Sequence, residues 1–104
     1  MADPGLTRWL EQHTGEAPLA LRDRVRLHLR TVARSGSVAE SLSQASRVAL
    51  DAVAAAPGGG RAIALDLLAA DALITLALLA QAESSPALLQ EFAASLLREP
   101  VGTP

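Results

Sequence analysis

The chain has 104 residues, of which 50% are apolar and 19% are charged, and its formal net charge is -2. A chain of this length forms one domain, residues 1–104, and buries roughly 60–65% of its surface without help from a disulfide or a metal. The sequence has no Cys, two His and 2% aromatic residues, which excludes thiolate metal sites and base-stacking platforms. We therefore expect neither a metal nor a cofactor.

The composition favours helices over strands. Ala and Leu together make up 41 of the 104 residues, and both residue types stabilise helices. Val and Ile, which favour strands, number only eight. The sequence therefore predicts an all-α fold.

Capping residues, prolines and glycines divide this helical chain. Asp3-Pro4, Pro18 and Ser85-Pro86 are typical of helix starts, because the proline ring is compatible with the first helical position. Ser37 and Glu40 have the spacing of a capping box. Helix ends are expected where glycine or proline follows, near residues 14–15, 35–36, 57–60 and 99–100. The predicted helices cover residues 4–13, 18–34, 38–56, 61–83 and 86–98, and residues 101–104 form a short tail.

The links between these helices contain only two to five residues, which makes neighbouring helices antiparallel. We expect a bundle of four main antiparallel helices and a short N-terminal helix. Trp9, with Leu6 and Leu10, should anchor the short helix to the rest. The helix over 38–56 carries a heptad-like seam rich in alanine, so its partner helix can approach closely.

The helix over 61–83 is apolar nearly all round, and such a helix is surrounded by other elements. A chain of 104 residues does not easily enclose it alone, so we expect a homo-oligomer, most simply a two-fold dimer. The alternative is that this helix is the centre of the single chain. The leucines expected at the interface between copies are Leu65, Leu68, Leu76 and Leu79.

Within the same helix, residues 63–80 form the one segment with the composition of a membrane span. Its nine Leu and Ile favour insertion by about 4 kcal/mol, and its two Asp oppose insertion by about 5–7 kcal/mol. The N-terminal residues lack the pattern of a signal peptide. The sequence therefore predicts a cytoplasmic protein that does not enter the membrane.

The segment 22–34 carries a ridge of arginines, Arg22, Arg26, Arg30 and Arg34, at four-residue spacing. With Arg61, which follows a glycine-rich link, the ridge is a candidate site for phosphate or for an acidic protein surface. The whole chain is mildly acidic and has no Lys, so nucleic acid is not the expected partner.

Asp66, Asp71 and His28 are the candidates for buried polar side chains. A carboxylate on so apolar a helix needs a partner. We expect Asp66 or Asp71 to be at least partly buried and matched by an arginine, Arg22, Arg26 or Arg30, of the same chain or of a second copy. No arrangement of residues typical of catalysis is visible, which leaves an enzymatic role open but not favoured. The function predicted from the sequence is that of a homo-oligomeric interaction or scaffold protein. The alternatives are an anion or nucleic-acid binder and a carrier of an apolar small molecule.

Overall fold

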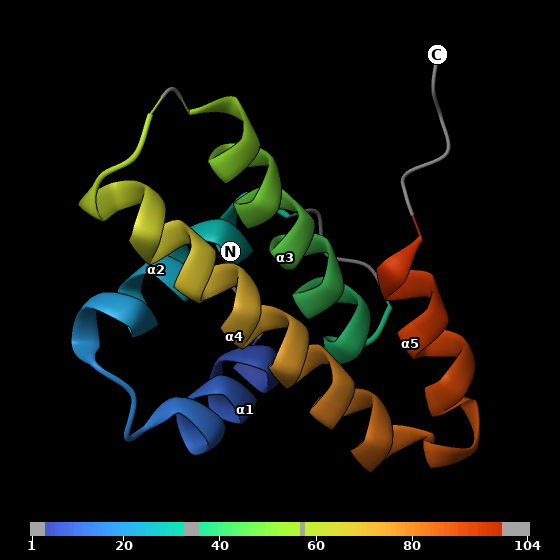
Figure 1. The fold of residues 1–104 in the computed structure, drawn as a ribbon. Coiled ribbons are helices and arrows are strands. Elements are labelled where there is room, and N and C mark those ends of the chain that lie inside the picture. The colour runs from blue at the N-terminus through green and yellow to red at the C-terminus, as the bar shows by residue number, and fades with distance from the viewer. Residues whose placement is uncertain (1–3, 33–35, 57, 99–104) are drawn as a thin grey trace.

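The computed structural model describes residues 4–32, 36–56 and 58–98 and places them in five α-helices that pack together (Figure 1). The helices are α1 (Pro4–Thr14), α2 (Leu19–Arg30), α3 (Val38–Ala55), α4 (Arg61–Ser84) and α5 (Leu89–Leu97), and a 3-10 turn over Pro86–Leu88 precedes α5. The predicted all-α fold is confirmed, and no strand occurs within these ranges. The finer arrangement of four main antiparallel helices and one short helix stays a prediction.

The predicted helix boundaries hold within two residues except at the start of α5, which lies three residues later than predicted because a 3-10 turn precedes it, and at the end of α2. Helix α2 stops at Arg30 rather than near residue 34, because the amides of Thr31 and Val32 donate to carbonyls three residues back, at 3.2 Å each. Such bonds form a turn rather than a further α-helical turn. Arg34, the expected cap Asp3 and the tail 101–104 lie outside the described residues.

The start of α3 follows the predicted capping pattern. The amide of Glu40 donates to the Ser37 hydroxyl at 3.1 Å, which pairs one of the free amides of the first turn. Gly36 precedes the cap with φ of 56°, a conformation that glycine adopts without strain. A Cβ at Gly36 would lie 2.9 Å from a carboxylate oxygen of Glu40, so the glycine also leaves room for that side chain.

The core lies between α3 and α4, which make the most extensive helix contact of the chain. Leu42 and Leu73 are fully buried there among small side chains. The predicted alanine seam on α3 is confirmed at its centre, because Ala45 and Ala49 are also fully buried. The alanines that α4 contributes to this core are Ala69, Ala70, Ala77 and Ala80. Small side chains on both helices allow the two backbones to approach closely.

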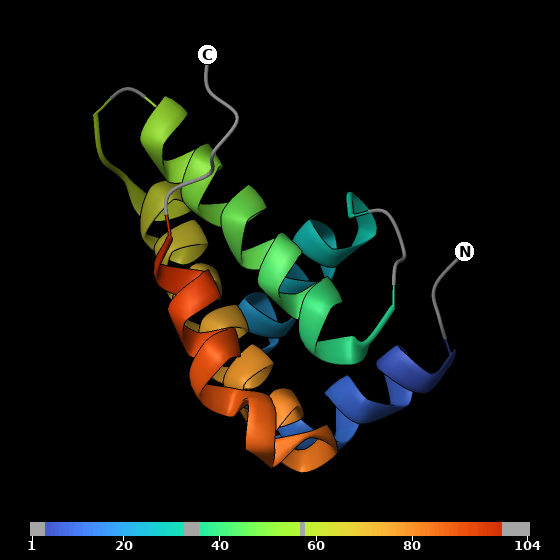
Figure 2. The same ribbon diagram turned by 90° about the vertical axis from the view of Figure 1, so that its right-hand side faces the viewer.

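The other helices cover this pair from two sides (Figures 1 and 2). On one side, α2 buries Val25 and α1 buries Leu10, with Trp9 half-buried as the expected anchor. On the other side, α5 lies next to the C-terminal part of α4 and has no buried residue of its own. The α4 side that points away from the core is left without a covering helix in Figure 1.

Candidate interaction surface

The helix α4 has two different sides. Its buried residues recur every three or four positions and face α3, and they include Leu73 and Leu76. On the opposite side Leu67, Leu68 and Leu79 are exposed by 53%, 56% and 39%. We call this side the exposed α4 face, which comprises the exposed residues Ala64, Leu67, Leu68, Asp71, Thr75 and Leu79.

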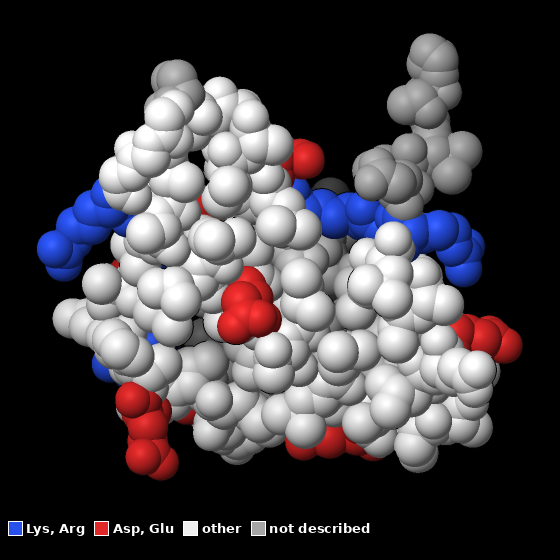
Figure 3. Space-filling view, viewed as in Figure 1, with Lys and Arg blue, Asp and Glu red and all other residues white. Residues whose placement is uncertain are grey.

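Only one of these six residues, Asp71, carries a charge. Figure 3 shows the same side of the molecule as mostly uncharged, with one group of acidic atoms in its middle and both acidic and basic side chains around it. Single exposed leucines are common on soluble proteins, but several apolar side chains exposed along one side of a helix are typical of an interaction site.

The four leucines that were expected at the interface between copies lie in three different environments. Leu68 and Leu79 lie on the exposed α4 face, and Leu65 is half-buried beside it. Leu76 is 8% exposed and packs in the core of the single chain, so the expectation that it lies between copies is wrong. Leu67, which the sequence did not single out, is exposed.

The helix α4 is long and apolar enough to cross a membrane, judged by length and composition alone. Its most apolar window has a mean hydropathy of 2.1, and 22% of that window is buried inside the chain. No other helix among the residues that the structure describes meets the same test.

Asp66 forms a polar cluster where α4 passes α2. Its carboxylate accepts a hydrogen bond from Nε2 of His28 at 2.8 Å, and the Arg24 guanidinium lies 3.5 Å from the same oxygen. The side chains of His28, Asp66 and Arg24 are 7%, 14% and 27% exposed. The expected pairing of a partly buried carboxylate with an arginine is present, but the arginine is not one of those predicted.

The geometry of α2 explains which of its arginines lies beside Asp66. Arg24 and His28 are four residues apart, so both lie on the face that meets α4. Arg22 and Arg26 are each two residues from Arg24, which places them about 160–200° away around the helix. Within the single chain, the prediction that Arg22, Arg26 or Arg30 pairs with Asp66 is therefore wrong, and pairing with an arginine of a second copy stays a prediction.

The second carboxylate of α4 has a different environment. Asp71 is exposed in the single chain, so of the two candidates for a partly buried carboxylate only Asp66 is one there. Asp71 and Asp66 are five residues apart, roughly 140° around the helix, and only Asp66 points to α2. His28, by contrast, is buried as expected. With 7% of its side chain exposed, His28 connects α2 to α4 and offers little surface to a substrate.

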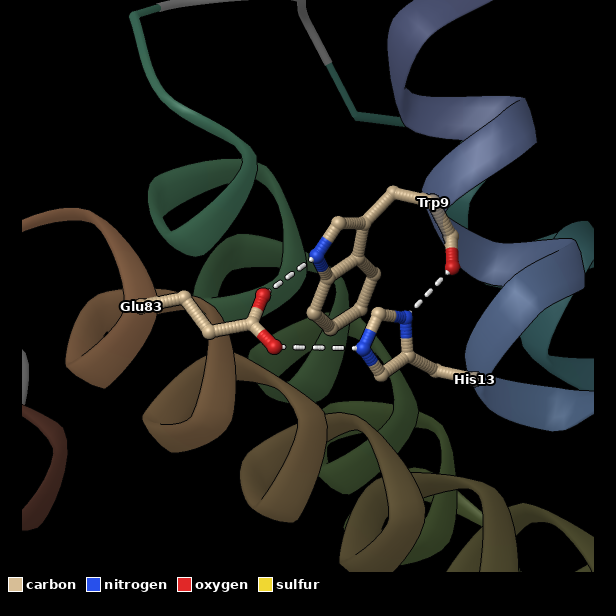
Figure 4. Close-up of polar contacts among 3 residues, drawn as sticks. All are labelled: Trp9, His13 and Glu83. Carbon is tan, nitrogen blue, oxygen red and sulfur yellow. Dashed lines mark hydrogen bonds and ion pairs between the residues drawn. The ribbon is translucent and has the colours of Figure 1, made fainter.

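A second polar cluster connects α1 to the C-terminal end of α4 (Figure 4). The indole N–H of Trp9 donates to one oxygen of Glu83 at 2.9 Å. His13 stacks on the indole ring, with ring centroids 3.9 Å apart, and its Nε2 lies 3.3 Å from the other oxygen of Glu83. The Nδ1 of His13 lies 2.8 Å from the carbonyl of Trp9.

These contacts act on the ionisation of Glu83. The hydrogen bond from Trp9 lowers the pKa of Glu83 below its ordinary value of 4.5. The hydrogen bond and the charge of His13 act in the same direction, and partial desolvation opposes them.

Only part of the arginine ridge is exposed and free to bind an anion in the structure. Arg22 is half-buried, and its Nε has no hydrogen-bond partner within the described ranges. Arg26 lies 3.9 Å from Asp23, and Arg30 and Arg61 are exposed. Anion binding by the ridge stays a prediction, as does the carrier function. Among the residues that the structure describes, no three His, Asp or Glu side chains come together as metal ligands.

No protein family, curated protein or solved structure matches this chain in the three comparisons made with known proteins.

Proposed function

We propose that this chain is a small helical interaction protein that acts as a homodimer, with the exposed α4 face covered by a second copy. The observation that carries the proposal is the exposure of Leu67, Leu68 and Leu79 along one side of a helix whose other side forms the core. Burying a fully exposed leucine contributes about 1.5–3 kcal/mol, and these three, which are about half exposed, contribute correspondingly less. Two-fold pairing brings the same face from each copy into one contact.

The polar groups of α4 support a protein partner rather than the membrane. Asp66 is bound to His28 and has Arg24 beside it, so insertion of α4 into lipid would break these contacts or carry the charged groups along. Asp71 and Thr75 are suited to a contact with another polar surface. We therefore place the dimer in an aqueous compartment, the cytoplasm.

The proposal is tested by Leu68→Glu, with Leu27→Glu as the matched control. Leu27 is 41% exposed and belongs to α2, so its replacement adds the same charge at another exposed leucine. In sedimentation velocity we expect the unmodified chain and Leu27→Glu to be dimers and Leu68→Glu to be a folded monomer. Far-ultraviolet circular dichroism checks that each variant retains its helices.

Two results contradict the proposal. One is equal sedimentation of Leu68→Glu and Leu27→Glu. The other is that the unmodified chain floats with phosphatidylcholine vesicles and Leu68→Glu does not. That result would mean that the exposed α4 face binds a lipid surface. Leu76→Glu does not serve as the test, because Leu76 lies in the core of the single chain.

A further inference from the structure

We infer that the two copies pair through antiparallel α4 helices, with the Asp71 carboxylate of each copy accepting a hydrogen bond from the Thr75 hydroxyl of the other. This inference rests on the proposed homodimer and specifies the orientation and register of its interface. It commits the exposed α4 face to one occupant, the same face of a second copy.

The first support is a seam of six residues along α4, four of which belong to the exposed α4 face. The intervals between them are 4, 3, 4, 3 and 4 residues, which is the spacing of a coiled-coil contact. Four of the six are exposed and two are half-buried in the single chain. In chain order the seam consists of Ala64, Leu68, Asp71, Thr75, Leu78 and Ala82.

The second support is that the seam is nearly symmetric about position 73. Ala64 and Ala82 are equally far from this position, as are Leu68 and Leu78. The remaining two members are Asp71 and Thr75. An antiparallel two-fold pair centred at position 73 therefore sets alanine against alanine, leucine against leucine and a carboxylate against a hydroxyl. Each contact occurs twice because of the symmetry.

The polar residues distinguish this pairing from the others that the seam allows. A parallel pair in register sets Asp71 against Asp71, which brings two carboxylates together without a donor. An antiparallel pair shifted by seven residues sets Asp71 against either Leu68 or Ala82 of the second copy, where its carboxylate loses water and gains no hydrogen bond. Only the pairing centred at position 73 gives each carboxylate a hydroxyl donor.

The pair Asp71–Thr75 thus sets the register in which the two α4 helices align. A single polar residue within an apolar coiled-coil seam fixes alignment, although it lowers stability relative to an apolar residue. In the single chain both side chains are exposed, and neither makes a side-chain hydrogen bond to another residue within the described ranges. Both groups are therefore available to a second copy.

Cysteine cross-linking tests the register, because the chain contains no Cys of its own. Leu68→Cys is mixed with ¹⁵N-labelled Leu78→Cys, and the mixture is oxidised. We expect covalent dimers that contain one chain of each isotope composition, detected by mass spectrometry. Each variant oxidised alone should stay uncoupled, because antiparallel pairing separates identical positions in the seam. Two control reactions measure non-specific disulfide formation. In one Leu27→Cys is oxidised alone, and in the other it is oxidised in a mixture with Leu78→Cys.

A substitution at Thr75 tests the hydrogen bond itself. Thr75→Val removes the hydroxyl and keeps the shape, and Thr75→Ser keeps the hydroxyl. We expect Thr75→Val to raise the dimer dissociation constant about tenfold or more, and Thr75→Ser to remain within about threefold of the unmodified chain.

These experiments separate the register from the existence of the dimer. If Leu68→Cys couples to itself and not to Leu78→Cys, or if Thr75→Val dimerises as the unmodified chain does, the inferred register is wrong and the proposed homodimer stands. If the unmodified chain sediments as a monomer, the proposed function itself is wrong and the register falls with it.

Discussion

The indole nitrogen of Trp9 lies 2.9 Å from a carboxylate oxygen of Glu83, although 74 positions separate the two residues in sequence. This contact joins the first helix of the chain to the end of α4. His13 completes it by stacking on the indole and approaching the second carboxylate oxygen. Docking of α1 therefore depends on polar contacts at one end as well as on the burial of Leu10.

The first prediction concerns the pH dependence of this docking. The pKa of Glu83 is lowered in the folded chain, so its contribution to stability is present above the ordinary value of 4.5. That contribution is lost as the pH falls through the lowered pKa, because the protonated carboxyl is a weaker acceptor. We expect the fluorescence of Trp9, the only Trp in the chain, to report release of α1 over this range.

Glu83→Gln provides the comparison for this prediction, because the amide oxygen still accepts from Trp9 but does not titrate. The acid-induced change in Trp9 fluorescence should be smaller in Glu83→Gln than in the unmodified chain. Superimposable acid profiles of the two proteins would show that Glu83 does not control the docking of α1.

The second prediction concerns the cluster around Asp66. Asp66→Ala leaves the nearly buried Nε2 of His28 without its acceptor and Arg24 without its counter-charge. We expect the free energy of unfolding to fall by about 1–3 kcal/mol. Asp51→Ala removes an exposed carboxylate from α3 and should change the free energy by less than about 0.5 kcal/mol.

Urea unfolding of both variants at one protein concentration measures this difference, since dimerisation makes the apparent stability depend on concentration. Equal unfolding midpoints for Asp66→Ala and Asp51→Ala would mean that the contacts of Asp66 add nothing to stability.

The third prediction concerns α5, which has no buried residue and is held in part by Arg47 of α3. The guanidinium of Arg47 donates to the carbonyls of Ser95 and Arg98 at 3.2 and 3.1 Å, at the C-terminal end of α5, where the Ser95 carbonyl also accepts from the amide of Arg98. Arg47→Ala should therefore accelerate amide hydrogen exchange in α5 several-fold. Arg30→Ala, which removes an exposed arginine from α2, should leave exchange in α5 unchanged.

The sequence predicted the helices well because their ends depend on local chemistry. The capping of α3 by Ser37 needs only residues 37–40, and proline and glycine interrupt the chain wherever they occur. The end of α2 was less predictable, because the chain there leaves the α-helix at Thr31 without a proline or glycine. No strong breaker marks that position in the sequence.

The exposed side of α4 was not predictable from the sequence, because a helix that is apolar all round has no preferred face. Leu68 and Leu76 are eight residues apart and of the same type, yet one is 56% exposed and the other 8%. Their difference comes from where α3 packs, which is a property of the whole fold. Arg24 was missed for a related reason: the four-residue periodicity that marks the other arginines excludes it, and only the position of α4 shows that it reaches Asp66.

The most direct test of the homodimer is the mass of the unmodified chain in solution, measured by sedimentation equilibrium from low to high micromolar concentration. We predict a mass twice the 10.7 kDa of the single chain at high micromolar concentration, with dissociation on dilution. A mass of 10.7 kDa throughout that range would contradict the account, because the exposed α4 face would then remain in water.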